Sequence, residues 1–152
     1  MSITDYNKYL PEAESKGKLA TFQDYSAATK AAAEEIPYGV AVQLGTDEQV
    51  NICNGSTPVG VALAQKIRDW VDPNADDQKY KTNDPVAVVR KGVIWVKAVE
   101  DVTAGDSAKV DNVTGDFRPS DTATTESVAF PSSAFKTSAV AGELAQLEIN
   151  LP

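Results

Sequence analysis

The feature that most constrains the fold of this chain is a series of short segments in which apolar residues alternate with small or polar ones. Val40, Val42 and Leu44 alternate in this way, and residues 49–53 repeat the pattern. A period of two places every second side chain on one face of a β-strand. Almost no helical pattern follows residue 36, so the sequence predicts an all-β protein.

The strands are expected to be short and separated by tight turns. Residues 86–89 and 93–96 predict a hairpin whose turn is Lys91-Gly92, and Asn54-Gly55 is a second strong turn dipeptide. In the last segment, Leu147, Ile149 and Leu151 can share one buried face. Many short strands with glycine and aspartate turns are typical of a small β-barrel or β-sandwich, of jelly-roll or tulip-like form. Further strands are predicted at residues 59–64, 107–111, 116–118, 126–130 and 134–137.

The first 35 residues have a different texture from the rest. Large apolar residues are sparse before Ile36 and follow no clean period. We therefore expect an extended N-terminal arm over residues 1–35 and a β body over residues 36–152. Within the arm, the alanine-rich residues 26–35 predict a short helix, because alanine has the highest helix propensity. Such a segment orders best against a neighbour.

Several large side chains in the arm are expected to contact other protein subunits. Aromatic residues in a region too poor in aliphatics to form a core are typical of docking anchors. Trp70 lies at the base of a polar loop predicted over residues 66–81 and is a further candidate. The candidate contact residues are Tyr6, Tyr9, Leu10, Pro11, Phe22, Tyr25 and Trp70.

Charge and hydropathy narrow the possible partners. The 152 residues include 22 acidic and 14 basic side chains, for a net charge of −8. An acidic surface repels nucleic acid and anionic membranes. No stretch approaches the roughly 20 apolar residues that span a bilayer, and the polar N-terminus has no signal-peptide core. We expect a chain that is made in the cytoplasm and used without secretion.

The residue types that carry most enzyme chemistry are scarce. The chain has no histidine and one cysteine, so a catalytic thiol, a structural zinc site and an intramolecular disulfide are disfavoured. Cys53 is predicted to be a small buried hydrophobe on a strand. No phosphate-binding glycine loop occurs. We expect neither an enzyme nor a protein with a metal or cofactor.

Two weaker patterns involve carboxylates. Asp72, Asn74 and Asp76 have the spacing that begins a calcium loop, but Pro73 interrupts it and Asp77 stands where the turning glycine belongs. A solvated acidic loop is the preferred interpretation. A carboxylate pair for glycoside hydrolysis is a distant alternative, because some of 22 acidic residues will lie close together by chance.

Aromatic residues suggest another function. Trp70, Trp95 and Tyr80 could form a sugar-binding platform, so a carbohydrate- or ligand-binding module is the alternative to a subunit-binding role. Trp95 lies inside a predicted strand, which favours a position in the core or in a subunit contact.

An ordered series of segments runs from about residue 18 to residue 150. The strongest is residues 80–96, YKTNDPVAVVRKGVIWV, and the others are residues 36–42, 59–63, 104–106, 114–117 and 135–145. The series resembles the structural cement, or capsid decoration, proteins of tailed bacteriophages. The loop over residues 66–79 is longer than this family leads us to expect.

The resemblance implies a virion protein on the outer surface of an icosahedral head. Such proteins join neighbouring subunits of the major capsid protein and resist the outward pressure of packaged DNA, and they have no catalytic residues. It further implies that the candidate residues contact the capsid or a sister copy. We expect the body to associate as a dimer or trimer.

Overall fold

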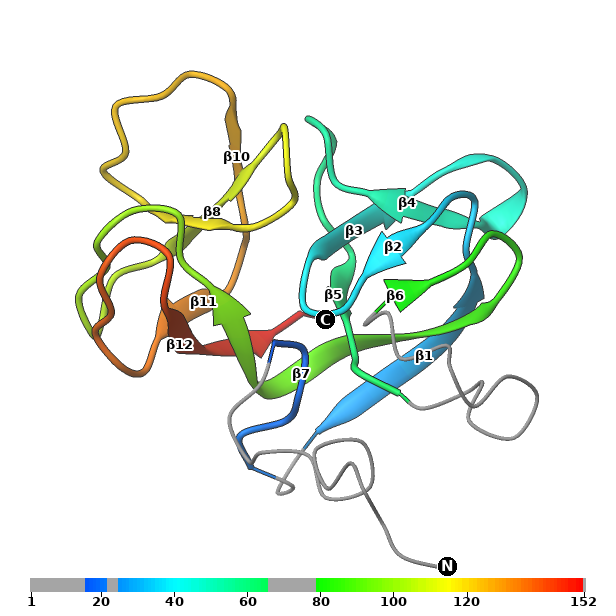
Figure 1. Ribbon diagram of the computed structural model, residues 1–152, viewed down its shortest axis with the longest axis horizontal. Helices are drawn as coiled ribbons and strands as arrows, with labels where there is room; N and C mark the ends of the chain where they lie inside the picture. The colour runs from blue at the N-terminus through cyan, green and yellow to red at the C-terminus, as the bar shows by residue number, and fades with distance from the viewer. Residues whose placement is uncertain (1–15, 22–24, 66–78, 152) are drawn as a thin grey trace, which may run out of the picture.

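The computed structural model describes residues 16–21, 25–65 and 79–151, which fold into β-strands joined by turns (Figure 1). One short 3-10 turn, η1 (Thr46–Glu48), is the only helical element in these ranges. The predicted all-β class is therefore confirmed. None of the described segments forms a helix with the length and apolarity needed to cross a membrane.

In the described ranges, twelve strands form three antiparallel sheets. The main sheet has the order β11-β12-β7-β5-β3-β4, with β1 also paired to β7; the smaller sheets are β10-β8-β9 and β2-β6. The strands are β1 (Ser26–Ala31), β2 (Ile36–Pro37), β3 (Ala41–Leu44), β4 (Val50–Ile52), β5 (Gly60–Ala62), β6 (Lys79–Tyr80), β7 (Pro85–Lys97), β8 (Ala108–Asp111), β9 (Phe117–Pro119), β10 (Ser127–Ala129), β11 (Ser133–Phe135) and β12 (Leu144–Asn150).

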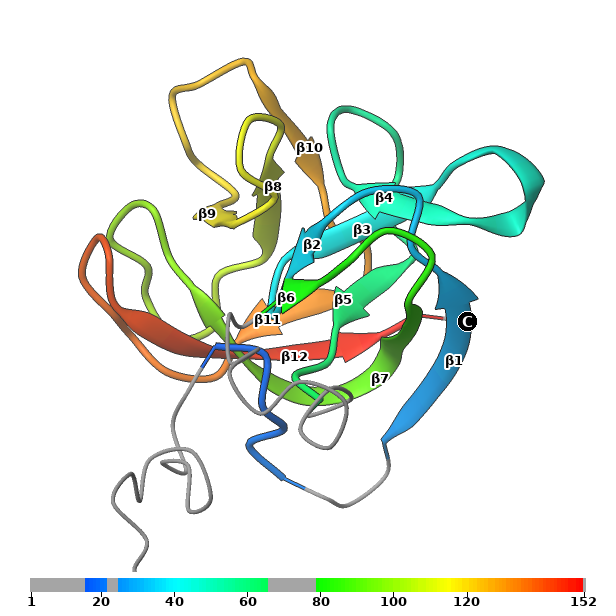
Figure 2. The same ribbon diagram turned by 45° about the vertical axis from the view of Figure 1, so that its right-hand side comes forward.

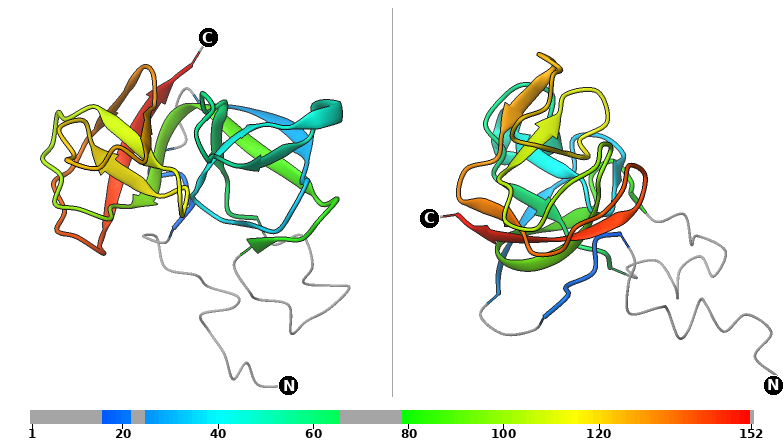
Figure 3. Two further views of the ribbon diagram at one scale, coloured as in Figure 1. Left: turned by 90° about the horizontal axis from the view of Figure 1, so that it is seen from above. Right: turned by 90° about the vertical axis from the view of Figure 1, so that its left-hand side faces the viewer.

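Strand β7 is shared by two lobes, which lie side by side in Figure 3. Its first half pairs with β1 and β5 in the N-terminal lobe, which contains β1 to β6. Its second half pairs with β12 in the C-terminal lobe, which contains β8 to β12. Because both β1 and β5 pair with Val88 and Val89, they lie on opposite edges of β7.

The hairpin predicted at Lys91-Gly92 is wrong, because β7 runs through this position as one strand of 13 residues. Gly92 has φ +138°, a conformation that L side chains rarely adopt. A Cβ on Gly92 would lie 3.0 Å from the Cβ of Tyr25, so glycine lets the N-terminal chain approach β7 closely. The glycine therefore marks a close approach of two chain segments inside a strand.

The helix predicted over residues 26–35 is also wrong. Residues 26–31 form β1, which is in register with β7 from Lys91 to Pro85. Alanine's helix preference is a few tenths of a kcal/mol per residue, which tertiary strand pairing readily overrides. The described residues of the expected arm, 16–21 and 25–35, therefore pack with the body.

In the N-terminal lobe the main sheet curls until its two ends there, β1 and β4, meet without closing into a barrel. Ala32, just after β1, forms a single parallel bridge with Val50 of β4. This one bridge is the only pairing between the two ends in the described ranges, so the fold is sandwich-like. One buried cluster lies inside the curl: Ala32, Ile36, Val40, Val42, Val50, Ala62, Tyr80, Val86 and Val88.

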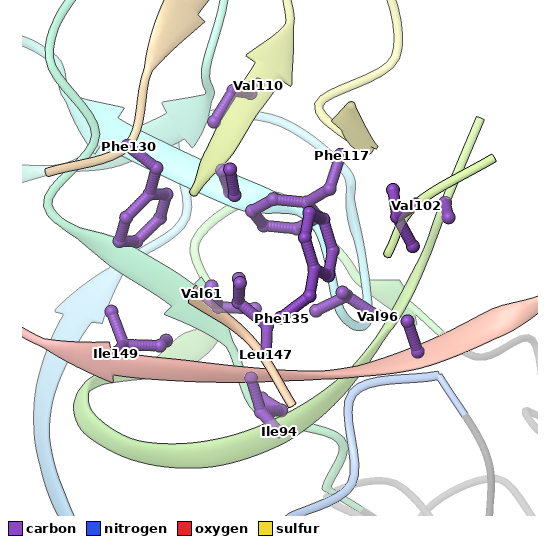
Figure 4. Close-up of a cluster of buried hydrophobic side chains, with 14 of the residues drawn as sticks. Val61, Ile94, Val96, Val102, Val110, Phe117, Phe130, Phe135, Leu147 and Ile149 are labelled. Atoms are coloured by element: carbon purple, nitrogen blue, oxygen red, sulfur yellow. The ribbon is translucent and has the colours of Figure 1, made fainter. Parts of the chain in front are cut away.

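A second buried cluster fills the C-terminal lobe and reaches across β7 (Figure 4). Phe117 and Phe130 pack with ring centroids 5.9 Å apart. Leu147 and Ile149 point from β12 into this cluster, which confirms the predicted buried face of the last strand. Cys53 is fully buried in the same cluster, as predicted, but it lies directly after β4 and not on a strand.

Candidate functional site

The described side chains give no sign of a reaction centre. Among them, no group of three or more histidine, cysteine, aspartate and glutamate residues is arranged to hold a metal ion. Burial raises the pKa of the Cys53 thiol, which keeps it protonated and unreactive near neutral pH. Asp72, Asn74 and Asp76 lie outside the described residues. The features described below are the N-terminal segment that contacts both lobes and the exposed aromatic side chains near it.

Residues 16–20, which we call the N-terminal clip, attach the start of the described chain to β7. The amide of Gly17 donates to the carbonyl of Trp95, and the amide of Trp95 donates to the carbonyl of Lys18, both at 2.8 Å. The amide of Ala20 donates to the carbonyl of Val93 at 2.8 Å. The clip thus forms an extra antiparallel strand segment on the β5 side of β7.

The clip also contacts both lobes. The amide of Ala64, just after β5, donates to the carbonyl of Gly17 at 2.8 Å. In the other lobe, the Lys16 ammonium lies 2.8 Å from a carboxylate oxygen of Asp116, in the turn between β8 and β9. The Asp116 side chain is only 8% exposed, so this ion pair is weakly screened. The N-terminal chain is therefore fixed to three parts of the body.

Two glycines make this arrangement possible. Gly17 and Gly39 both have positive φ, +89° and +79°. A Cβ on Gly17 would lie 2.8 Å from the amide nitrogen of Gly39, and a Cβ on Gly39 would lie 2.7 Å from that of Gly17. The two backbones touch, which leaves no room for a side chain at either position.

The outer face of the main sheet presents a tryptophan. Trp95 is opposite Gln146 of β12, whereas its neighbours Ile94 and Val96 point into the core. Trp95 is partly exposed, so its interpretation as a core residue is wrong. A contact with another subunit stays a prediction for this side chain.

Of the candidate contact residues, the structure describes Tyr25 alone. Its side chain is 48% exposed and lies beside Gly92 at the start of β1. A large aromatic ring that is half exposed at a strand end is a suitable anchor for a partner protein. The other candidates lie outside the described residues: Tyr6, Tyr9, Leu10, Pro11, Phe22 and Trp70.

Tyr80 is not available for a sugar platform. It is fully buried, packs edge-to-face on Tyr38 with centroids 5.1 Å apart, and donates its hydroxyl to the carbonyl of Leu63. Tyr38 donates to the carbonyl of Gln65 in the same way. These two tyrosines therefore hold Gln65 close to β6. Gln65 directly precedes the segment of residues 66–78, and β6 directly follows it.

The clip is the part of the site that the sequence did not reveal. Residues 16–20 contain one glycine and no alternating pattern, so the sequence predicts no strand there and places them in the arm. The only local signal is Gly17, and a lone glycine does not specify pairing with a strand more than 70 residues away.

Comparison with known proteins identifies the family and the fold. The family model described as structural cement protein (E217 gp24/Pam3 gp6) matches residues 1–150. No curated protein matches the chain. A chain from the capsid of Myoviridae phage XM1 has a TM-score of 0.67 at 15% identity, with 97% of this chain and 98% of that chain covered.

A second similar structure is the N base of the head fiber gp8.5 of bacteriophage phi29. Its TM-score is 0.53 at 16% identity, with 82% of this chain and 93% of that chain covered. At these identities the two structures establish a shared fold, while the family match extends over nearly the whole sequence. The chain therefore belongs to the structural cement protein family of bacteriophages.

Proposed function

We propose that this protein binds the outer surface of the icosahedral head, bridges neighbouring major capsid subunits and stabilises the shell against the pressure of packaged DNA. The observation that carries the proposal is the match of residues 1–150 to the structural cement family. The similar folds in a phage capsid and in a head-fibre base support it. The net charge of −8 suits a surface that faces away from DNA.

The proposed mechanism is avidity between several weak contacts. The residues before the clip carry Tyr6 and Tyr9, and the clip fixes their point of attachment to β7 and both lobes. The body supplies further contacts, among them Tyr25 and Trp95. In a dimer or trimer, each copy contacts a different capsid subunit, and linkage raises the effective concentration of every contact.

Co-sedimentation with expanded heads stripped of this protein tests the proposal. Wild-type protein is expected to bind at a fixed, saturable ratio to the major capsid subunit. Removal of residues 1–15 is expected to keep the fold and to weaken head binding at least tenfold, because the proposed anchors are lost. No saturable binding of the wild type to intact expanded heads would refute the proposal.

The truncation must end before the clip. A protein lacking residues 1–30 also lacks the clip and most of β1, so its failure to bind would report unfolding. The matched control is the variant in which Tyr6 and Tyr9 are both changed to Ser in the full chain. If this variant and the truncated protein both bound at full strength, the residues before the clip would have no role in anchoring.

A further inference from the structure

The outer edge of β1 is open in the described part of the chain. The amide of Ala32 donates to Asp84 and its carbonyl accepts from Asn83, so the even-numbered residues of this strand face β7. Backbone groups alternate in direction along a strand. The N–H and C=O groups of Ala27 and Thr29 therefore point away from β7, and over Ser26–Lys30 β7 is the one described strand beside β1, whereas Ala32 already bridges Val50 of β4. Figure 2 shows β1 at the margin of the molecule.

The other ends of the main sheet are covered. Beside β4, the amide of Ala33 donates to the carbonyl of Val50, and the Glu34 carboxylate accepts from the amide of Ile52. Beside β11, Phe135 exchanges backbone hydrogen bonds with Gly105 and Asp106. The open edge over Ser26–Lys30 has small side chains apart from Lys30, and such an edge is a template for another strand unless it is protected. In the described residues, this edge of β1 has no neighbouring strand.

Lys30 determines what kind of strand can pair here. It is opposite Val86, and Ala28 is opposite Val88, so both side chains leave the sheet on the face of the buried N-terminal cluster. An inward-facing lysine on an edge strand disfavours pairing with a neutral strand, because its charge would lose water without gaining a partner. A strand that places a carboxylate opposite Lys30 compensates this cost.

The N-terminal segment of the same sequence has such a pattern. Ile3, Asp5 and Asn7 alternate with Thr4, Tyr6 and Lys8, and Pro11 ends the run. Threonine and tyrosine favour strands. The segment's one carboxylate is that of Asp5, which in a strand would share a face with Ile3. Antiparallel pairing with Asp5 opposite Lys30 would place Tyr6 opposite Thr29, an aromatic and β-branched pair of the kind that stabilises sheets.

We propose that the β1 edge receives residues 5–8 of a second copy of this chain, with Asp5 paired to Lys30. A second copy is favoured because Lys16 is held on the β5 side of β7, at Asp116, whereas β1 lies on the opposite edge. Asp5 lies 11 residues before Lys16, which allows a reach of roughly 35 Å. Reciprocal exchange of two such segments closes a symmetric dimer. This inference rests on the self-association that we propose above.

Charge reversal tests the pairing in the full-length protein. Sedimentation velocity over a series of concentrations is expected to show self-association of the wild type, weakened about tenfold by either Asp5→Lys or Lys30→Glu. The double variant is expected to return to within about threefold of the wild type, because the charge pair is restored with reversed sign. Glu12→Lys, which lies after Pro11, and Lys109→Glu, in β8, are the matched controls and should leave association unchanged.

The outcomes separate this inference from the proposed function. A monomeric wild type, unchanged single variants or a double variant weaker than both singles would overturn the strand exchange. Head binding measured on the same proteins reports the cement role independently. A monomeric protein that still binds heads at a saturable ratio would refute the exchange and leave the cement role intact.

Discussion

At the scale of single residues, the contact between Gly39 and Gly17 predicts a large effect from one methyl group. Gly39→Ala adds a Cβ that would lie 2.7 Å from a backbone nitrogen, at φ +79°. We expect the free energy of unfolding to fall by about 3 kcal/mol, from the left-handed backbone and the steric conflict together. Urea denaturation followed by circular dichroism measures the loss.

Gly105→Ala is the matched control for this substitution. Gly105 also has positive φ, +98°, but a Cβ there would meet no atom within 4 Å. The expected loss is about 1 kcal/mol, the cost of the backbone conformation alone. Equal losses for the two variants would show that the close contact between the two glycines contributes nothing to stability.

The buried thiol of Cys53 predicts slow chemistry and a dependence on pH. Burial raises the pKa of this thiol, so the folded state disfavours the reactive thiolate. We expect a thiol-specific reagent to label Cys53 at the rate of unfolding. The stability that this group contributes is present below the ordinary thiol pKa of about 8.5 and is lost as the pH rises further.

The control for the pH effect is Cys53→Ala, which should show a smaller loss of stability between pH 8 and pH 10. Rapid labelling of the native protein at pH 7 would contradict the assigned burial. Labelling in 8 M urea should be fast in either case, and this checks that the reagent is active.

Burial of single residues was predictable where it depends on alternation along one strand. The burial of Leu147 and Ile149 was predicted correctly because every second residue from Ala145 to Ile149 in β12 is apolar. Trp95 did not, because a strand pattern gives two faces without saying which one is covered. That choice is made by residues distant in the sequence, since the covered face of β7 packs in the cluster that contains Phe117 and Phe135.

At the scale of elements, the clip predicts a sharp boundary for truncation. Removal of residues 1–20 eliminates the backbone hydrogen bonds to Trp95, Val93 and Ala64, and it leaves the buried Asp116 without Lys16. We expect a loss of about 3–5 kcal/mol relative to the protein that lacks residues 1–15. Thermal unfolding of the two truncated proteins measures the difference.

The variant Lys16→Met in the full chain separates the ion pair from the backbone bonds. The free energy of unfolding lost in Lys16→Met should be less than half of that lost on removal of residues 16–20, because the substitution leaves the backbone hydrogen bonds of Gly17 and Lys18 intact. If the two truncated proteins had the same stability, the clip would be a passive segment of the chain.

Elements with local signals were predicted and those formed by distant contacts were not. The short strands β3, β4, β5 and β8 follow from alternation and from the turns between them. The sequence predicts a helix at β1 because alanine's helix preference is the only local signal there. It predicts a hairpin within β7 because Lys91-Gly92 has the composition of a turn, whereas Gly92 in fact allows the close approach of Tyr25.

At the scale of the whole molecule, the shared strand β7 predicts that both lobes unfold together. Phe135→Ala removes a ring from the core of the C-terminal lobe and is expected to cost about 3–5 kcal/mol. We expect hydrogen exchange to accelerate in both lobes by a similar factor, and circular dichroism and tryptophan fluorescence to report one transition. Exchange that accelerates in β8 to β12 alone would show two independent units.

The segment of residues 66–78 is predicted to be dispensable for folding. Gln65 and Tyr80 are held together by a side-chain hydrogen bond of 3.3 Å, and Tyr38 contacts both. Replacement of residues 66–78 with a six-residue glycine-serine linker should leave the melting temperature within about 3 °C of the wild type. The entropy of closing a loop changes only slowly with the length of the loop. Head binding that persists in this variant would exclude Trp70 as an essential contact.

The antiparallel bonding of the clip has a mechanical consequence. A tension applied to the N-terminus along the axis of β7 would load the hydrogen bonds of Gly17, Lys18 and Ala20 in shear, so that they must break at the same time. The same tension applied across the strand would peel them apart one by one. The direction of an applied force therefore decides whether the hydrogen bonds of the clip break together or one after another.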